Sequence, residues 1–129
     1  MMPGGLDPIS ELQRLTVSLR GVFEQKDGCL VFHFTGQLDA YSEKQFMEYV
    51  LDVLKAGNLP AVIDLSKIDF LDSSGLGALV QLAKQCTDAK RAFSLVGNSR
   101  VMQTVKLVRL EEFLHLAQDL PSALSNLAA

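Results

Sequence analysis

The stretch "FLDSSGLGALV", Phe70–Val80, places an aspartate, two serines and two glycines between an apolar segment and a helical pattern. Aspartate and serine side chains cap the first turn of a helix, and glycine lets two backbones approach closely. The stretch therefore predicts a helix that begins here, directly after a buried strand. Its two hydroxyl groups also leave four chemical roles to weigh: a nucleophile, a phosphate cradle, a phosphorylation site and a simple helix cap.

On both sides of this turn, short apolar runs alternate with segments of helical spacing. Strands are predicted over Leu15–Phe23 and in the runs "CLVFHFTG" (29–36), "PAVIDL" (60–65), "AFSLVG" (92–97) and "FLHLA" (113–117). "KDG" at 26–28 predicts a tight hairpin turn. A helix is expected from Ser42, where Ser42 and Gln45 have the spacing of a capping box. Another is expected to follow "DSSG" in the serine motif, "DSSGLG" (72–77), and further helices are expected over 98–110 and 119–129. This order predicts an α/β fold with a mostly parallel four- to five-stranded sheet, an antiparallel entry hairpin and about four helices.

The length of 129 residues and the 48% hydrophobic content predict one domain with a real core. Residues 1–14 are expected to be a flexible tail, because the first dozen contain two prolines and two adjacent glycines, and residues 15–129 to be the domain. A net charge of −3 without a basic run argues against binding of nucleic acid or a membrane surface. With no signal peptide pattern, a cytoplasmic protein is expected, in which Cys29 and Cys86 are buried free thiols.

A catalytic nucleophile is not supported by the motif. A hydrolase elbow needs G-x-S-x-G, but Asp72 stands two positions before Ser74. The two candidate bases, His33 and His115, fall in predicted strands, where a structural role is expected. A triad assembled by folding remains open at this point.

Phosphate and metal sites are also poorly supported. The motif lacks the lysine of a P-loop, and no G-x-G-x-x-G pattern is present. Asp64, Asp69 and Asp72 suggest a metal, but no histidine joins them, so turn and cap hydrogen bonds are the favoured role. We therefore expect no metal and no cofactor.

A regulatory phosphorylation site fits the motif best. A phosphate would add a charge of about −1.5 to −2 beside the positive end of the helix dipole, which favours anions. A partner docked over the turn would instead have to bury an unpaired charge, which costs several kcal/mol. About 3 kcal/mol weakens binding roughly 100-fold. The turn therefore suits a switch that changes binding without unfolding the chain.

Together with "AVIDLS" (61–66) and "FTGQLDAYSEKQF" (34–46), the stretch "IDFLDSSGLGALV" (68–80) resembles the STAS domain of bacterial anti-sigma factor antagonists. The resemblance extends from about Leu15 to Leu127. It implies a non-enzymatic switch that, when unphosphorylated, binds an anti-sigma factor that is also a serine kinase, and so releases the sigma factor. In that family the second serine of D-S-S-G, here Ser74, is phosphorylated, which ends the binding, and a metal-dependent serine phosphatase restores it.

The resemblance also implies which residues meet the partner. ATP would belong to the kinase, so no cofactor is assigned to this chain. A STAS module whose pathway has an output other than a sigma factor is the alternative, and a small serine hydrolase is a remote one. Homodimer formation is left open. The expected partner-binding residues are Asp39, Asp72, Ser73, Ser74, Gly75 and Leu76.

Overall fold

The computed structural model describes residues 11–127, which form a six-stranded sheet with four helices. The strands follow one another across the sheet in chain order; β1–β2 and β2–β3 are antiparallel, and the later pairs are parallel. The predicted fold class is confirmed, and two two-residue strands, β1 and β6, complete the sheet. The elements are β1 (Gln13–Arg14), β2 (Leu19–Lys26), β3 (Cys29–Leu38), α1 (Glu43–Leu54), β4 (Ala61–Leu71), α2 (Ser73–Asp88), β5 (Phe93–Gly97), α3 (Ser99–Leu107), β6 (Leu116–Ala117) and α4 (Leu120–Leu127).

The entry hairpin forms at the predicted turn. Lys26 pairs with Cys29, so the loop contains only Asp27 and Gly28, both with positive φ (52° and 78°). Two such residues match the twist of the flanking strands, which is why Asp-Gly is favoured here.

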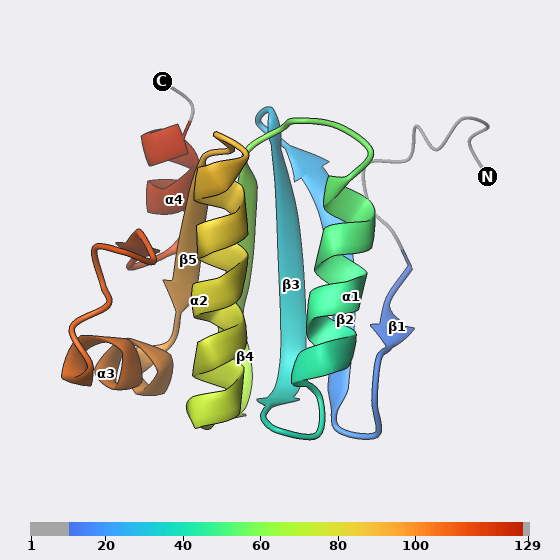
Figure 1. Ribbon diagram of the computed structural model, residues 1–129, viewed down its shortest axis with the longest axis vertical. Coiled ribbons are helices and arrows are strands. Elements are labelled where there is room, and N and C mark those ends of the chain that lie inside the picture. Colours follow the sequence, from blue (N-terminus) through green and yellow to red (C-terminus); the bar gives the residue numbers. More distant parts are fainter. Residues whose placement is uncertain (1–10, 128–129) are drawn as a thin grey trace.

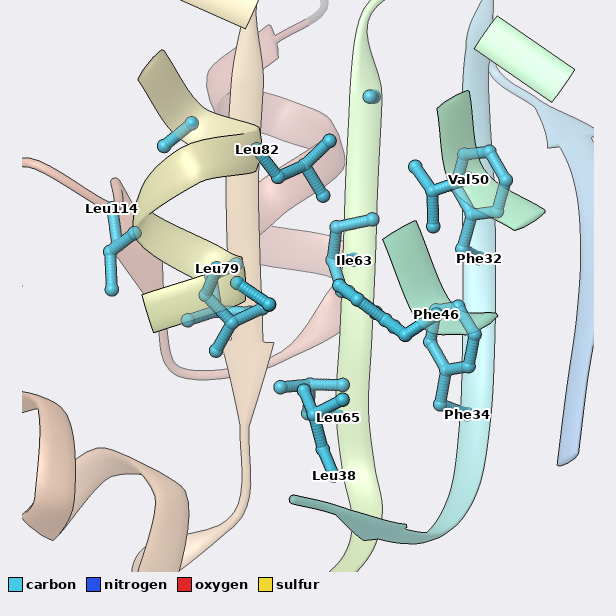
Figure 2. Packing of buried hydrophobic residues seen from close by; sticks show 14 of the residues in the cluster. Phe32, Phe34, Leu38, Phe46, Val50, Ile63, Leu65, Leu79, Leu82 and Leu114 are labelled. Atoms are coloured by element: carbon cyan, nitrogen blue, oxygen red, sulfur yellow. The ribbon is translucent and has the colours of Figure 1, made fainter. Parts of the chain in front are cut away.

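The main core lies between the sheet and the paired helices α1 and α2, which lie side by side on one face (Figure 1). Alternate residues of β3 and β4 point into this layer, as strand geometry requires. Figure 2 shows them meeting apolar side chains of both helices. The labelled residues, all buried, are Phe32, Phe34, Leu38, Phe46, Val50, Ile63, Leu65, Leu79, Leu82 and Leu114.

A smaller apolar layer forms where α4 meets the strands. It includes Val31, Val62 and Val96 of the sheet and Leu124 of α4. Cys29 belongs to this layer, whereas Cys86 of α2 belongs to the main core. Both thiols are free and buried, as predicted, and burial raises the pKa of each.

Several strand bounds differ from the prediction. Of the strand expected over 113–117, only Leu116–Ala117 pairs, as β6, because residues 111–115 form turns, and the strand expected over 29–36 continues to Leu38. The strand expected from Leu15 begins at Leu19, because the amides of Leu15 and Thr16 both donate to the Leu19 carbonyl and close a turn. The strand expected over 60–65 continues to Leu71, past a register shift beside His33–Thr35 of β3. This irregularity hides the strand period in the sequence.

The predicted flexible tail, residues 1–14, falls mostly on residues 1–10, which lie outside the described part of the chain. The last two residues of the predicted tail, Gln13 and Arg14, form β1. Among residues 11–127, no helix has both the length and the apolar composition to cross a membrane.

Candidate functional site

The serine motif lies where the carboxyl ends of β3 and β4 meet the amino ends of α1 and α2, at the lower edge of the sheet in Figure 1. Parallel strands deliver their following loops to one edge of a sheet, which is where binding sites of open α/β folds form. The loop from Asp39 to Ser42 and the turn at Asp72 are thereby brought together.

Asp72 is the N-cap of α2 and joins the two loops. Its backbone is extended (φ −102°, ψ −174°), and its Oδ1 accepts the Gly75 amide at 2.8 Å. Its Oδ2 accepts the Ala40 amide of the β3–α1 loop at 3.2 Å. Both carboxylate oxygens are therefore engaged in holding the edge together, which is the structural role favoured by the sequence.

Asp39 is only 8% exposed and organises the β3–α1 loop. Its Oδ1 accepts the Tyr41 amide at 3.0 Å, and its backbone carbonyl accepts the amides of Ser42 and Glu43. The side chain faces its own loop.

The predicted capping box at the start of α1 is wrong. Ser42 does stand at the N-cap position, but its side chain makes no cap hydrogen bond. The side chain is fully buried. Ser42 Oγ lies 2.9 Å from the Gln37 carbonyl oxygen and 3.2 Å from Asp39 Oδ1, to which it donates, and it accepts the Asp39 amide at 3.0 Å. Gln45 is exposed. The hydroxyl is used to close the loop and is not available to the helix.

The two glycines of the motif occupy different surroundings. A Cβ at Gly75 would run into the backbone carbonyl of Leu38 and a methyl of Leu71, so only glycine lets α2 start this close to β3. A Cβ at Gly77 would meet nothing within 4 Å. Leu76, between them, is half-buried and packs against the main core.

The two serines also differ in exposure. Ser73, the first residue of α2, is exposed, whereas Ser74 is half-buried. Ser74 lines a shallow depression between α1 and α2. The other lining residues are Glu43, Met47, Gly77, Ala78 and Gln81.

Exposed apolar side chains near the turn were missed by sequence reasoning. Tyr41 is 87% exposed in the β3–α1 loop, and Phe70 is 46% exposed at the end of β4. Val17 is 91% exposed in the turn before β2, next to Ser18, whose carbonyl accepts the Gln37 amide of β3. An aromatic residue inside the polar "DAYS" loop was the available signal. Because the strand predicted over 60–65 ends before Lys67–Leu71, the sequence does not indicate that Phe70 points outward.

Neither candidate base is bonded to the serines. The two ring nitrogens of His33 lie 2.7 Å from Asp64 Oδ2 and 2.7 Å from Glu24 Oε2. Because His33 alternates with Phe32 and Phe34 along β3, it faces away from the main core. His115 is exposed beside β6. The geometry therefore assembles no Ser–His pair at the motif.

The three aspartates weighed as metal ligands are separated by their contacts. Asp64 binds His33 and also accepts the Ser66 amide, Asp72 caps α2, and Asp69 is exposed. Within residues 11–127, no group of three or more His, Cys, Asp or Glu side chains is arranged to hold a metal ion.

A family model for the STAS domain matches residues 22–123 of the chain. The chain also resembles the crystal structure of an anti-sigma factor antagonist from Mycobacterium paratuberculosis, with a TM-score of 0.72 and 26% identity over 87% of this chain and 96% of that chain. RsbS from Moorella thermoacetica gives a TM-score of 0.67 with 25% identity, over 81% of this chain and 92% of that chain.

A more distant structure shows the same fold. The anti-sigma factor antagonist SpoIIAA in its unphosphorylated form superposes with a TM-score of 0.59 at 17% identity, over 84% of this chain and 88% of that chain. The region matched by the family model, residues 22–123, includes both the serine motif and the β3–α1 loop.

Proposed function

Because this chain belongs to the STAS domain family, we propose that it is an anti-sigma factor antagonist whose binding is switched off by phosphorylation of Ser74. Its unphosphorylated form would bind an anti-sigma factor that is also a serine kinase, and a serine phosphatase would restore that form. The similarity to an anti-sigma factor antagonist over 96% of that protein's length supports this role.

The observation that carries the proposal is the position of Ser74 in the first turn of α2, beside an accessible depression. The turn is held by the Asp72 cap and by the close approach of Gly75 to Leu38, so it does not depend on the Ser74 hydroxyl. A group added to this oxygen can therefore change the surface while the turn keeps its shape.

The chemical step would take place in the complex with the kinase. Ser74 Oγ forms a bond to the γ-phosphorus of the partner's ATP as the bond to the β–γ bridging oxygen breaks. ADP leaves with that oxygen, and the hydroxyl proton passes to a base of the partner. This chain supplies only the positioned hydroxyl.

The phosphate would affect folding and binding differently. The first amides of a helix have no acceptor within the helix, and together with the helix dipole they favour an anion. In a docked complex the same charge would be desolvated without a partner, which costs several kcal/mol. At about 1.4 kcal/mol per decade, phosphorylation is expected to weaken binding by roughly 100-fold or more.

The surface around Ser74 suits a protein partner. Tyr41 and Phe70 present exposed aromatic surface on the two segments that flank the motif. Aromatic side chains contribute strongly to protein interfaces. Ser73 and Ser74 would contact the partner directly, whereas Asp39 and Asp72 would act by holding the two loops in place.

A serine hydrolase is disfavoured by the same geometry. General-base activation of a serine requires a base within hydrogen-bond reach of its hydroxyl. Both ring nitrogens of His33 are occupied by carboxylates.

Substitution of Ser74 tests the proposal. The kinase is first captured from native cells with immobilised Ser74→Ala protein, purified, and titrated with the wild type, Ser74→Ala and Ser74→Asp. We expect Ser74→Ala to bind and to resist inactivation by ATP, and Ser74→Asp to bind at least tenfold more weakly. Ser73→Ala is the matched control and should have the smaller effect. Equal affinities of Ser74→Ala and Ser74→Asp would contradict the charge switch.

A further inference from the structure

The depression beside Ser74 contains one charged side chain, that of Glu43. The remaining side chains that line it are apolar or uncharged, and none of the six lining residues is basic. Glu43 is the first residue of α1 and is half-buried. A phosphate on Ser74 would therefore share this space with a carboxylate.

The depression is open at Gly77, so no side chain at that position separates the two charges. Gly77, one of the lining residues, has open space where a side chain would stand. Like charges in a shared space repel each other, and each favours the protonated form of the other.

We infer that Glu43 is the residue that opposes any phosphate on Ser74 and so prevents the chain from neutralising that phosphate itself. The inference rests on the proposed phosphorylation of Ser74. Its consequence is that the phosphate and the Glu43 carboxylate lie together at the docking surface without a basic partner among the lining residues, and this combined negative charge excludes the partner. A basic residue in place of Glu43 would pair with the phosphate and weaken the switch.

Glu43 also has an ordinary role that must be separated from this one. An acidic residue in the first turn of a helix stabilises that helix through its dipole. Stability measurements alone would report only this role. A titration of the phosphate itself reports the electrostatic interaction with Ser74.

The test uses full-length protein with phosphoserine incorporated at position 74 during translation, so that no kinase is needed. The pKa of the phosphate is measured by ³¹P NMR in the wild-type background, in Glu43→Gln and in Glu48→Gln. Glu48 is the matched control because it is exposed on the same helix and its loss changes the net charge equally. It stands five residues, or about 7.5 Å of helix rise, beyond Glu43.

We expect Glu43→Gln to lower the phosphate pKa by about half a unit and Glu48→Gln to leave it nearly unchanged. Glu43→Lys, which puts an ammonium group in place of the carboxylate, should lower the phosphate pKa further than Glu43→Gln does, and it supplies the same test if Glu43→Gln does not fold. Identical titrations for the parent and Glu43→Gln, or equal shifts in Glu43→Gln and Glu48→Gln, would overturn the inference. Failure of the proposed function would appear elsewhere, as equal kinase binding by the phosphorylated and unphosphorylated proteins.

Discussion

At the level of single residues, the two glycines of the serine motif have different reasons to be glycine. Gly75 is required by packing, because its α-carbon lies against the Leu38 carbonyl where β3 ends. Gly77 is exposed and has no neighbour that would exclude a side chain. Within this chain, Gly77 weakens α2, since glycine in a helix is less stable than alanine.

Replacement of each glycine by alanine separates these roles. Gly75→Ala should lower the free energy of unfolding by about 1–3 kcal/mol, because either the helix or β3 must move. Gly77→Ala, the matched control, should raise it by about 0.5–1 kcal/mol through helix propensity. Urea unfolding of both variants measures the difference. Equal destabilisation by the two substitutions would show that the close approach at Gly75 is not a constraint.

Residue roles were predictable from sequence where they depend on local geometry. The start of α2 in the motif and the turn at Asp27–Gly28 each involve atoms a few residues apart, and both are confirmed. The helix cap was expected from one of the two serines, with Ser73 favoured, but Asp72 supplies it and Ser73 is the first residue of the helix. The prediction for Ser42 is wrong because its hydroxyl donates to an acceptor five residues earlier, the Gln37 carbonyl near the end of β3. That contact appears only once the loop is folded.

At the level of elements, the start of α2 is coupled to the start of α1 through Asp72. One carboxylate oxygen holds the first turn of α2, and the other holds the Ala40 amide in the loop that leads into α1. The Asp72 side chain therefore helps to set the position of Ser74 relative to Tyr41.

Substitution of Asp72 tests the coupling. Asp72→Asn retains one oxygen, which is expected to stay on the Gly75 amide as a cap, while the bond to Ala40 is lost. Asp72→Ala loses both and should cost about 1 kcal/mol of stability. Amide hydrogen exchange of Ala40 should be faster in both variants, whereas that of Gly75 should be faster only in Asp72→Ala. Unchanged exchange at Ala40 would show that the loop is held in some other way.

The elements themselves were predicted well where the hydrophobic period is regular. The buried run of β5 and the four helices follow from spacing alone. The second half of β4 was missed because Lys67 and Asp69 resemble a loop, while Ile68 and Leu71 are buried only because the strand shifts register against β3. Such a shift depends on the pairing strand and leaves no periodic signal in the sequence.

At the level of the whole molecule, His33 links three strands on the side of the sheet away from α1 and α2. It contacts Glu24 of β2 and Asp64 of β4 from its own place in β3, at 2.7 Å each. The hydrogen bond to Asp64 raises the pKa of His33 above its ordinary 6.5, burial opposes this, and the bond to Glu24 adds to it. Burial also acts to raise the pKa of Asp64, but the bonds from His33 and Ser66 hold it below the ordinary 3.8.

These shifts predict the pH dependence of stability. Since the folded pKa of His33 is raised, its contribution is complete below about pH 6.5 and is lost as the pH rises through the folded value. Asp64, with a lowered pKa, contributes above about pH 3.8 and loses its contribution as the pH falls through its folded value. The pair therefore contributes most between these limits. Above them, a neutral ring donates only one proton, so one carboxylate loses its donor.

The comparison with His33→Gln isolates this effect. The excess stability of the wild type over the variant, measured by urea unfolding, should fall as the pH rises from about 6.5 through the folded pKa of His33. A constant or rising excess over this range would contradict the assigned protonated state of His33.

The central claim also concerns the molecule as a whole, because a phosphate on Ser74 is expected to change what the protein binds while its fold is kept. The most direct measurement is the intact mass of the protein from its native cells, with phosphatases inhibited, followed by phosphopeptide mapping. The account predicts a species with one phosphate, located on Ser74. A phosphate on Ser73 instead, or no phosphate under any growth condition, would contradict it.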